Sequence, residues 1–235
     1  MSTPTDYEEL ATRLAHMARD LLQQKSVQDT LDRIVEYAVQ LIEGCSDAGI
    51  LVLRKRQQVE TLATTSDRVR ESDRAQGEEA EGPCFDAANG GAHIYRIADL
   101  SESQQRWPRY APRVRELGYG SMMGFLLFTE QDNLGALNLY APQPSAFTER
   151  SEQAGWILAS HAAIALSSAR TEADLHTAIS TRQEIGEALG IVMERHKLSE
   201  SQAFDKIRKA SQDNNTKLRE IAHHIIHTGE TPGAS

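Results

Sequence analysis

The most informative stretch of the chain is residues 182–229, with the sequence RQEIGEALGIVMERHKLSESQAFDKIRKASQDNNTKLREIAHHIIHTG. Ser199 and, three residues later, Gln202 make a capping box, which marks the N-terminus of a helix. Thr216 can cap a further helix, and Gly229 can close that helix in the left-handed conformation. The stretch therefore predicts three short helices, the first of which ends near its Arg-His-Lys run.

Apolar residues recur at helical spacing in each of these three segments, so they can meet in one small core. The residues expected in this core are Ile185, Leu189, Val192, Met193, Ala203, Phe204, Ile207, Ala210, Leu218, Ile221, Ala222 and Ile225. A domain of about 50 residues buries little surface by itself. We therefore expect it to lean on the preceding helix, on another domain or on a second copy of the chain.

A long segment without proline precedes these helices. From Thr148 to Lys197 the composition is helical, and residues repeat at the four- and three-residue intervals of a degraded coiled-coil seam. The seam residues are Ile164, Ser168, Thr171, Leu175, Ala178, Arg182, Ile185, Leu189 and Val192. Because several of them are polar, two interpretations stay open. The helix packs on its own domain or, as we favour, it is a signalling helix that pairs in a homodimer.

Three glycines, Gly155, Gly186 and Gly190, interrupt this helical segment. Gly186 and Gly190 lie four residues apart, on one stripe of the helix. Glycine inside a helix costs roughly 1 kcal/mol relative to alanine, so the pair suggests that something approaches the backbone closely. The approaching group is either another helix or a nucleic acid.

The N-terminal part of the chain alternates between helical and strand patterns. Apolar residues follow helical spacing from Tyr7 to Glu43, with Asp29 as the expected N-cap of a second helix that ends at Gly44. Strands are expected at 50–53, 59–65, 93–97, 121–129 and 134–140, and a further helix at 107–117. The charged segment 67–81 is either a short helix or a loose connection. This order predicts an antiparallel sheet with flanking helices, followed by a small all-α domain. The fold class is α+β.

Length and composition limit the kind of protein further. A chain of 235 residues, 40% hydrophobic and 25% charged, suits one medium and one small globular domain. The net charge of −9 is uneven, because acids and bases balance after Ala178 and the surplus acid precedes it. No stretch suits a membrane span or a signal peptide, so we expect a cytoplasmic protein. Cys45 and Cys84 are expected to be free thiols.

Six short motifs in the N-terminal part resemble those of a GAF domain. They are Glu81-Gly82-Pro83-Cys84, Asp99-Leu100, Arg106-Trp107-Pro108, Leu117-Gly118, Ser121-Met122-Met123-Gly124-Phe125 and Gly135-Ala136-Leu137-Asn138-Leu139-Tyr140. The resemblance covers roughly Ser26 to Arg170 and implies a sensor that can hold a small molecule. The ligand stays unassigned, since two polar members of the cyclic-nucleotide pattern are missing after Asn138 and Phe147.

The C-terminal segment resembles an ANTAR domain along its whole length. The resemblance is carried by Arg182-x-x-Ile185-x-x-Ala188-x-Gly190-Ile191-x-Met193, Ala203-Phe204-x-x-Ile207-Arg208-x-x-Ser211-Gln212 and Asn215-x-Lys217-Leu218-Arg219-x-x-Ala222-x-x-Ile225. It implies an antiterminator that binds paired RNA stem-loops and so blocks formation of a terminator. The whole chain is then similar to the GAF–ANTAR fusions of the antitermination regulator family.

Polar residues of the second and third helices suit RNA. Arginine and lysine can bind phosphate, and glutamine and asparagine can hydrogen-bond to the edges of looped-out bases. The expected RNA-binding residues are Arg208, Lys209, Gln212, Asn215, Lys217 and Arg219. A solvated helix face remains the alternative, because the domain as a whole is neutral. Phe204 is expected in the core, so stacking of bases on an aromatic ring is not the expected mode.

These signals divide the chain into five parts. They are an N-terminal helix at 1–25, the GAF-like sensory domain at 26–170, a linking helix at 171–181, the RNA-binding ANTAR domain at 182–230 and a disordered tail at 231–235. We expect a signal in the GAF domain, or the dimer contact of that domain, to change the linking helix. This change would alter the separation of the two RNA-binding domains in the dimer.

Other functions have weaker support in the sequence. The three C-terminal helices could instead bind DNA or a protein partner, although the third helix is apolar and rich in histidine. A GAF-fold reductase acting through Cys84 would need a cysteine relay, with Cys45 as the one other thiol. His223 and His227 lie four residues apart but have no third metal ligand nearby. We expect no catalytic residue, no metal and no cofactor.

Overall fold

The computed structural model describes residues 4–54, 58–88, 94–129 and 133–232. The chain divides into two compact units, 1–170 and 171–235, which we call unit 1 and unit 2. Helix α6 (Glu149–His196) runs from one unit into the other. Each unit has its own hydrophobic core and is described separately.

Unit 1 contains an antiparallel sheet of five strands within the described residues. The strands are β1 (Asp47–Arg54), β2 (Gln58–Thr64), β3 (Ile94–Ile97), β4 (Ser121–Phe128) and β5 (Asn133–Ala141), in the spatial order β2-β1-β5-β4-β3. β1 pairs with β2 and β4 pairs with β5, each pair antiparallel, which confirms the two hairpins predicted from the sequence. The tip of the first hairpin, at 55–57, lies outside the described residues.

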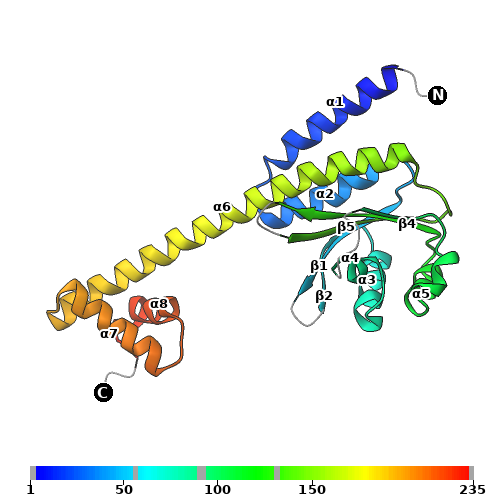
Figure 1. Ribbon diagram of the computed structural model, residues 1–235. Helices are drawn as coiled ribbons and strands as arrows, with labels where there is room; N and C mark the ends of the chain where they lie inside the picture. Colours follow the sequence, from blue (N-terminus) through cyan, green and yellow to red (C-terminus); the bar gives the residue numbers. More distant parts are fainter. Residues whose placement is uncertain (1–3, 55–57, 89–93, 130–132, 233–235) are drawn as a thin grey trace. The chain divides into compact units, whose positions relative to one another are not determined.

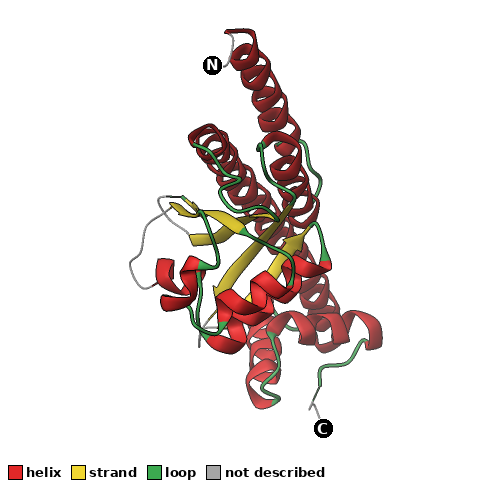
Figure 2. Cartoon of the chain, turned by 90° about the vertical axis from the view of Figure 1, so that its right-hand side faces the viewer, coloured by secondary structure: helices red, strands yellow, loops and turns green. Residues whose placement is uncertain are grey.

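Helices cover both faces of this sheet. On one face lie α1 (Pro4–Leu21), α2 (Val27–Leu41) and the first part of α6; on the other lie α3 (Asp67–Glu79), α4 (Pro83–Ala88), the 3-10 helix η2 (Glu102–Gln105) and α5 (Tyr110–Glu116). Figure 2 shows the strands with helices on both sides. The α+β class predicted from the sequence is confirmed.

Strand residues alternate between the two cores, as the period of a β-strand requires. Met123 of β4 and Leu139 of β5 pack against α1, α2 and α6. Their chain neighbours Met122 and Tyr140 point to the opposite face and pack against α3 and α5. Because both faces are covered, β1, β4 and β5 are apolar at most positions. This explains the apolar runs that the sequence shows in these three strands.

The start of α2 differs from the prediction. Ser26, not Asp29, is the N-cap, because its Oγ accepts a hydrogen bond from the backbone N–H of Asp29 at 3.0 Å. A cap accepts from an N–H two or three residues later, so a Ser-x-x-Asp pair favours the serine. The helix ends at Leu41, with Ile42 as C-cap, and Gly44 follows with φ +87°.

Unit 2 consists of the end of α6, α7 (Glu200–Asp213) and α8 (Leu218–Thr228). The predicted capping box is confirmed: Ser199 Oγ accepts from the N–H of Gln202, and the Ser199 N–H donates to Gln202 Oε1 at 3.0 Å. Asn215 has φ +49° in the turn, and Gly229 ends α8 at φ +71°.

The predicted N-cap of α8 is wrong. Lys217 occupies this position, with no side-chain hydrogen bond to the helix. The hydroxyl of Thr216 donates instead to the carbonyl oxygen of Asn214 at 3.1 Å, and its own carbonyl accepts from Ser211 Oγ at 2.6 Å. Thr216 therefore closes the α7–α8 turn, which leaves it unavailable to cap the helix.

The predicted core of unit 2 is largely confirmed, with one correction. Most of the predicted members that are only partly buried pack against a cluster of eight buried residues. The buried residues are Ala188, Val192, Ala203, Ile207, Ala210, Ile221, Ala222 and Ile225. Phe204 is 38% exposed and lies outside this cluster. Each residue of a helix turns the side chain by about 100°, so Phe204 leaves the face that Ala203, Ile207 and Ala210 turn inward.

Candidate nucleic-acid interface and sensory interior

The six predicted RNA-binding residues lie on α7, on the turn that follows it and at the start of α8. Arg208 and Gln212 are one turn apart on an exposed stripe of α7, and Lys209 lies beside them. The guanidinium of Arg208 pairs with Asp205 at 2.7 Å, and both side chains are more than half exposed. An exposed pair of this kind is weak and exchanges readily for another anion.

Arg219 lies in a different environment from the other five residues. Its guanidinium makes two hydrogen bonds to Glu184 of α6, at 3.1 Å from Nε and 2.9 Å from the terminal nitrogen. This contact raises the pKa of Arg219 above its usual value and lowers that of the Glu184 carboxyl. Arg219 therefore ties α8 to α6.

The remaining candidates are exposed and available. Lys209 and Lys217 make no ion pair within the described part of the chain, and Gln212 and Asn215 also face solvent. The left-handed backbone at Asn215 is fixed by the closed turn between α7 and α8. These side chains form a small polar surface of cations and amides, which we call the α7–α8 surface (Arg208, Lys209, Gln212, Asn215 and Lys217).

Gly186 and Gly190 are open to solvent. A Cβ atom added at either position would meet no other described atom within 4 Å. Packing against another described helix of the same chain therefore does not explain the pair. A shallow hollow adjoins Gly190 and is lined by Glu187, Ile191, Glu194, Arg195 and Gly229. Two explanations remain: a second molecule contacts the helix at these glycines, or the glycines have no packing role.

The interior of unit 1 holds a buried polar cluster between the sheet and α3 and α4. Asp73 accepts a hydrogen bond from the Thr61 hydroxyl at 2.8 Å, and Asn138 Oδ1 accepts one from the Tyr95 hydroxyl at 2.5 Å. Gln76 Oε1 accepts from the backbone N–H of Cys84 at 3.2 Å. Asp73 Oδ1 and Gln76 Nε2 have no hydrogen-bond partner among the described residues. The cluster is enclosed but incompletely satisfied.

Burial controls the ionisation of this cluster. Desolvation raises the pKa of Asp73 to about 7, against the opposing effects of the Thr61 hydroxyl and the Arg70 charge. Desolvation also raises the pKa of the Cys84 thiol to about 12. A thiol with so high a pKa is protonated at neutral pH and is a poor nucleophile.

Several aromatic side chains fill the interior of unit 1. Trp107, Tyr110 and Tyr119 are buried in the core beneath α3 and α5, and Tyr95 packs against them. The Tyr95 ring lies directly over Gly124, where a Cβ would meet it at 2.1 Å. His93 lies outside the described residues. These rings occupy part of the interior between the sheet and helices α3 and α5.

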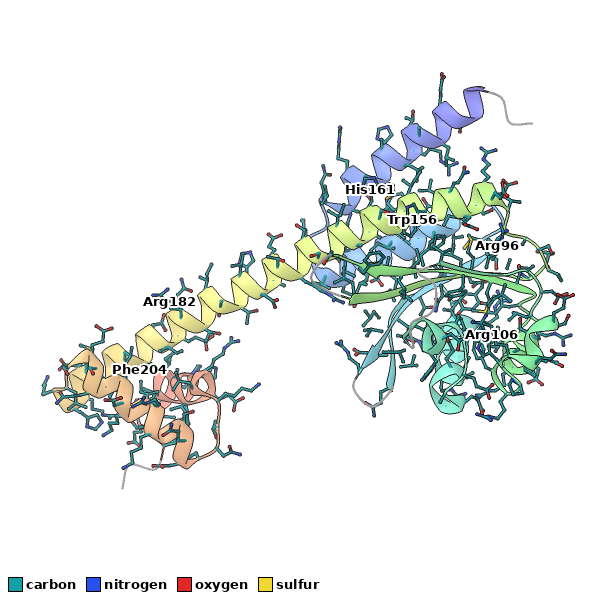
Figure 3. All side chains as sticks on the ribbon, in the orientation of Figure 1. Arg96, Arg106, Trp156, His161, Arg182 and Phe204 are labelled. Atoms are coloured by element: carbon teal, nitrogen blue, oxygen red, sulfur yellow. The ribbon has the colours of Figure 1, made fainter. Side chains whose placement is uncertain are left out.

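The solvent-facing side of α6 carries large apolar residues. Trp156, Ile157 and Ile164 are 40–57% exposed on unit 1, and Leu175 and Ile179 are 56–59% exposed on unit 2. Trp156 lies on α6 near His161 (Figure 3). Ile164 and Leu175 belong to the predicted seam. The seam residues Ile185, Leu189 and Val192, in contrast, pack in the core of unit 2.

Two of the C-terminal histidines contact each other on α8. The rings of His223 and His227 stack with their centres 4.1 Å apart, and a ring nitrogen of His227 lies 2.8 Å from the His223 carbonyl oxygen. Among the described residues, no group of three or more His, Cys, Asp or Glu is arranged to hold a metal ion. In the same part of the chain, no helix has both the length and the apolarity that a membrane crossing requires.

Comparison with known families assigns both units. A GAF domain model matches residues 24–167, and an ANTAR domain model matches residues 173–226. The chain is a GAF–ANTAR protein. The resemblance inferred from the sequence is confirmed. A sensory domain joined to an ANTAR domain makes the chain a signal-regulated regulator of the ANTAR type, built from two domains that are not catalytic.

Solved structures show the same fold for the GAF part. The GAF domain of an Acinetobacter phosphoenolpyruvate-protein phosphotransferase has a TM-score of 0.50 at 16% identity, over 72% of this chain and 97% of that one. Its Coxiella burnetii counterpart scores 0.54 at 16% identity, over 70% and 96%. The photosensory core module of a Stigmatella aurantiaca phytochrome scores 0.62 at 11% identity, over 91% and 46%. A search of curated protein sequences finds no significant match.

Sequence reasoning missed two features of these sites. The buried pair Asp73 and Gln76 lies in a helix whose composition is mostly charged, so the sequence suggests solvent exposure. The sequence signal for their burial is the helical spacing of four and three residues that joins Val69, Asp73 and Gln76 on the inward face. The residue type of Phe204 favours the core, whereas its angle around α7, about 100° from Ala203, places it outside the buried face.

Proposed function

We propose that this GAF–ANTAR protein is a signal-responsive regulator of transcription antitermination. The ANTAR helices would bind RNA stem-loops and so prevent a terminator from forming, under control of the GAF domain. The protein would act in the cytoplasm as a homodimer, without catalysis of its own. The observation that supports this most is the α7–α8 surface, where cations and amides stand exposed around one closed turn.

The chemistry of this surface suits a folded RNA with unpaired bases. Lys209 and Lys217 can each bind a phosphate without breaking an ion pair of the described chain. Gln212 and Asn215 can hydrogen-bond to base edges, which are accessible in loops but not inside an A-form stem. Because unit 2 is neutral overall, we expect binding to depend on a few placed contacts and to be strongest at low salt.

Control through α6 follows from its apolar surface. Ile164, Leu175 and Ile179 are large and more than half exposed, which a soluble helix seldom maintains without a partner. Pairing of two α6 helices would cover them. A signal that changes the populations of two pairing states would then change the separation of the two ANTAR domains in the dimer. The affinity for a single RNA with two hairpins would change with it.

The primary test is binding of the full chain to an RNA of two stem-loops at low ionic strength, measured by fluorescence anisotropy. Arg208→Ala, Lys217→Ala and Arg219→Ala should each weaken binding without unfolding unit 2. Lys197→Ala is the matched control, because it removes an exposed, ion-paired cation at the end of α6 away from this surface. Unchanged affinity in all three variants would refute the proposed surface.

Two further observations separate this function from its competitors. If the protein binds duplex DNA of equal length as tightly as it binds the RNA, it is a DNA-binding regulator instead. Sedimentation of the purified chain measures the oligomeric state, and native mass spectrometry detects any small molecule retained in unit 1. A monomer at micromolar concentration would contradict control by pairing of α6.

A further inference from the structure

Phe204 is the only phenylalanine, tyrosine or tryptophan that follows Trp156 in the sequence. It lies on α7 and is 38% exposed, although its neighbour Ala203 and the next turn's Ile207 are completely buried. Smaller aliphatic residues fill the core of unit 2 without it. The one large aromatic ring of this unit therefore contributes little to the core that holds the unit together.

The residues beside Phe204 give its exposure a meaning that a lone apolar residue would lack. Arg208 lies one turn further along the same stripe of α7, and Gln212 lies one turn beyond Arg208. An aromatic ring, a guanidinium and an amide thus share one exposed stripe. Unpaired bases stack on rings and on guanidinium planes, and amides hydrogen-bond to their edges.

We propose that Phe204 is the stacking platform for an unpaired loop base of the bound RNA. Arg208 and Gln212 would contact the same base or its neighbour, and Lys209 would bind an adjacent phosphate. This assignment rests on the RNA-binding function proposed above and adds a determinant of specificity to it. Bases inside a stem are already stacked on both sides, so Phe204 discriminates a loop from a continuous duplex.

A second copy of the chain is the competing occupant of this ring. Charged residues flank Phe204 on α7, which disfavours an apolar protein interface there: Glu200 precedes it by one turn, and Asp205 and Arg208 follow it. The exposed apolar residues Leu175 and Ile179 lie on α6, outside this stripe. A protein interface that buried Phe204 would also have to bury these charges.

The test compares an aliphatic with an aromatic replacement in the full chain. A fluorescently labelled RNA with two stem-loops is first selected by the wild-type protein from a pool with randomised loops. Phe204→Leu, which keeps the apolar bulk but has no ring face, should bind this RNA about 10- to 100-fold more weakly. Phe204→Trp should bind as tightly as the wild type. For a duplex that contains the same stems but no loops, both variants should have the same affinity as the wild type.

A second measurement locates the stacked base. Placing 2-aminopurine at each loop position in turn should reveal one position whose fluorescence changes with the wild type and Phe204→Trp but not with Phe204→Leu. Wild-type affinity in Phe204→Leu overturns the proposal while RNA binding stands. Equal losses in the leucine and tryptophan variants, or a dimer that dissociates in Phe204→Leu, also overturn it. Failure of the wild type to select any RNA refutes the proposed function as well.

Discussion

The two units place their polar and aromatic groups in opposite ways. Unit 1 encloses Asp73, Asn138 and Tyr140 in its interior, whereas unit 2 exposes its amides, its cations and its single aromatic ring. An enclosed polar cluster can respond only to something as small as a proton, a water or a compact ligand. An exposed surface can bind a macromolecule. The contrast separates detection of a signal from the output that follows it.

The largest expected effect tests whether the two units are independent. Ile207→Ala in unit 2 and Ile34→Ala in unit 1 each remove a fully buried isoleucine, at a cost of about 2–5 kcal/mol. Both tryptophans, Trp107 and Trp156, belong to unit 1. In urea, Ile207→Ala should therefore shift the circular-dichroism transition and leave the tryptophan-fluorescence transition in place, because unit 2 unfolds alone. Equal shifts of both signals would show that the units unfold as one.

The next effect tests the enclosed cluster of unit 1 through pH. The folded-state pKa of Asp73 is about 7, above the value near 4 of an unfolded aspartate, so between these values the native state holds more protons. The free energy of unfolding should therefore fall as pH rises from about 4 to 7, by up to about 4 kcal/mol from this group, and level off above 7.

Asp73→Asn should remove this dependence, because an amide of the same shape does not titrate. The exposed Glu102→Gln serves as control. Urea unfolding at several pH values measures the effect. A slope between pH 4 and 7 that persists in Asp73→Asn would show that the dependence arises elsewhere.

Glycine substitutions give a smaller effect of opposite sign in the two units. Gly190→Ala should raise the stability of the unbound chain by up to about 1 kcal/mol, because its Cβ meets no described atom. Gly49→Ala should lower the stability of unit 1, since its Cβ would meet Val69 at 2.5 Å. Thermal unfolding without RNA checks both. Loss of stability in Gly190→Ala would mean that another chain already contacts this helix.

The smallest expected effect concerns Glu184 and Arg219. Glu184→Gln releases Arg219 from its ion pair and removes a negative charge near the α7–α8 surface. We expect a modest gain in RNA affinity at low salt and none at high salt, because exposed charges are screened. Anisotropy titrations at two salt concentrations measure it. Weaker binding at low salt would indicate that this pair positions α8 for the RNA.

The sequence predicts those features that depend on short-range patterns. The capping box at Ser199, the left-handed Gly229 and both hairpins follow from local residue types, and the structure confirms them. Competition between neighbouring candidates for the same role is harder to predict. Ser26 replaces Asp29 and Lys217 replaces Thr216 as caps, because the choice depends on where the adjacent turn ends.

The candidate sites were predictable to a lesser extent. The engagement of Arg219 depends on Glu184, which lies 35 residues before it on another helix. The buried state of Asp73 depends on strands and helices that meet it from several parts of the chain. Residue types predict which chemistry is available, but tertiary contacts decide which groups remain free to use it.

The most direct test of the central claim is the salt dependence of RNA binding by the full chain. If Lys209 and Lys217 each neutralise a phosphate, the slope of log affinity against log salt should fall by about two when both are changed to alanine. Lys197→Ala should leave the slope unchanged. An identical slope in the double variant and the wild type would contradict RNA binding by the α7–α8 surface.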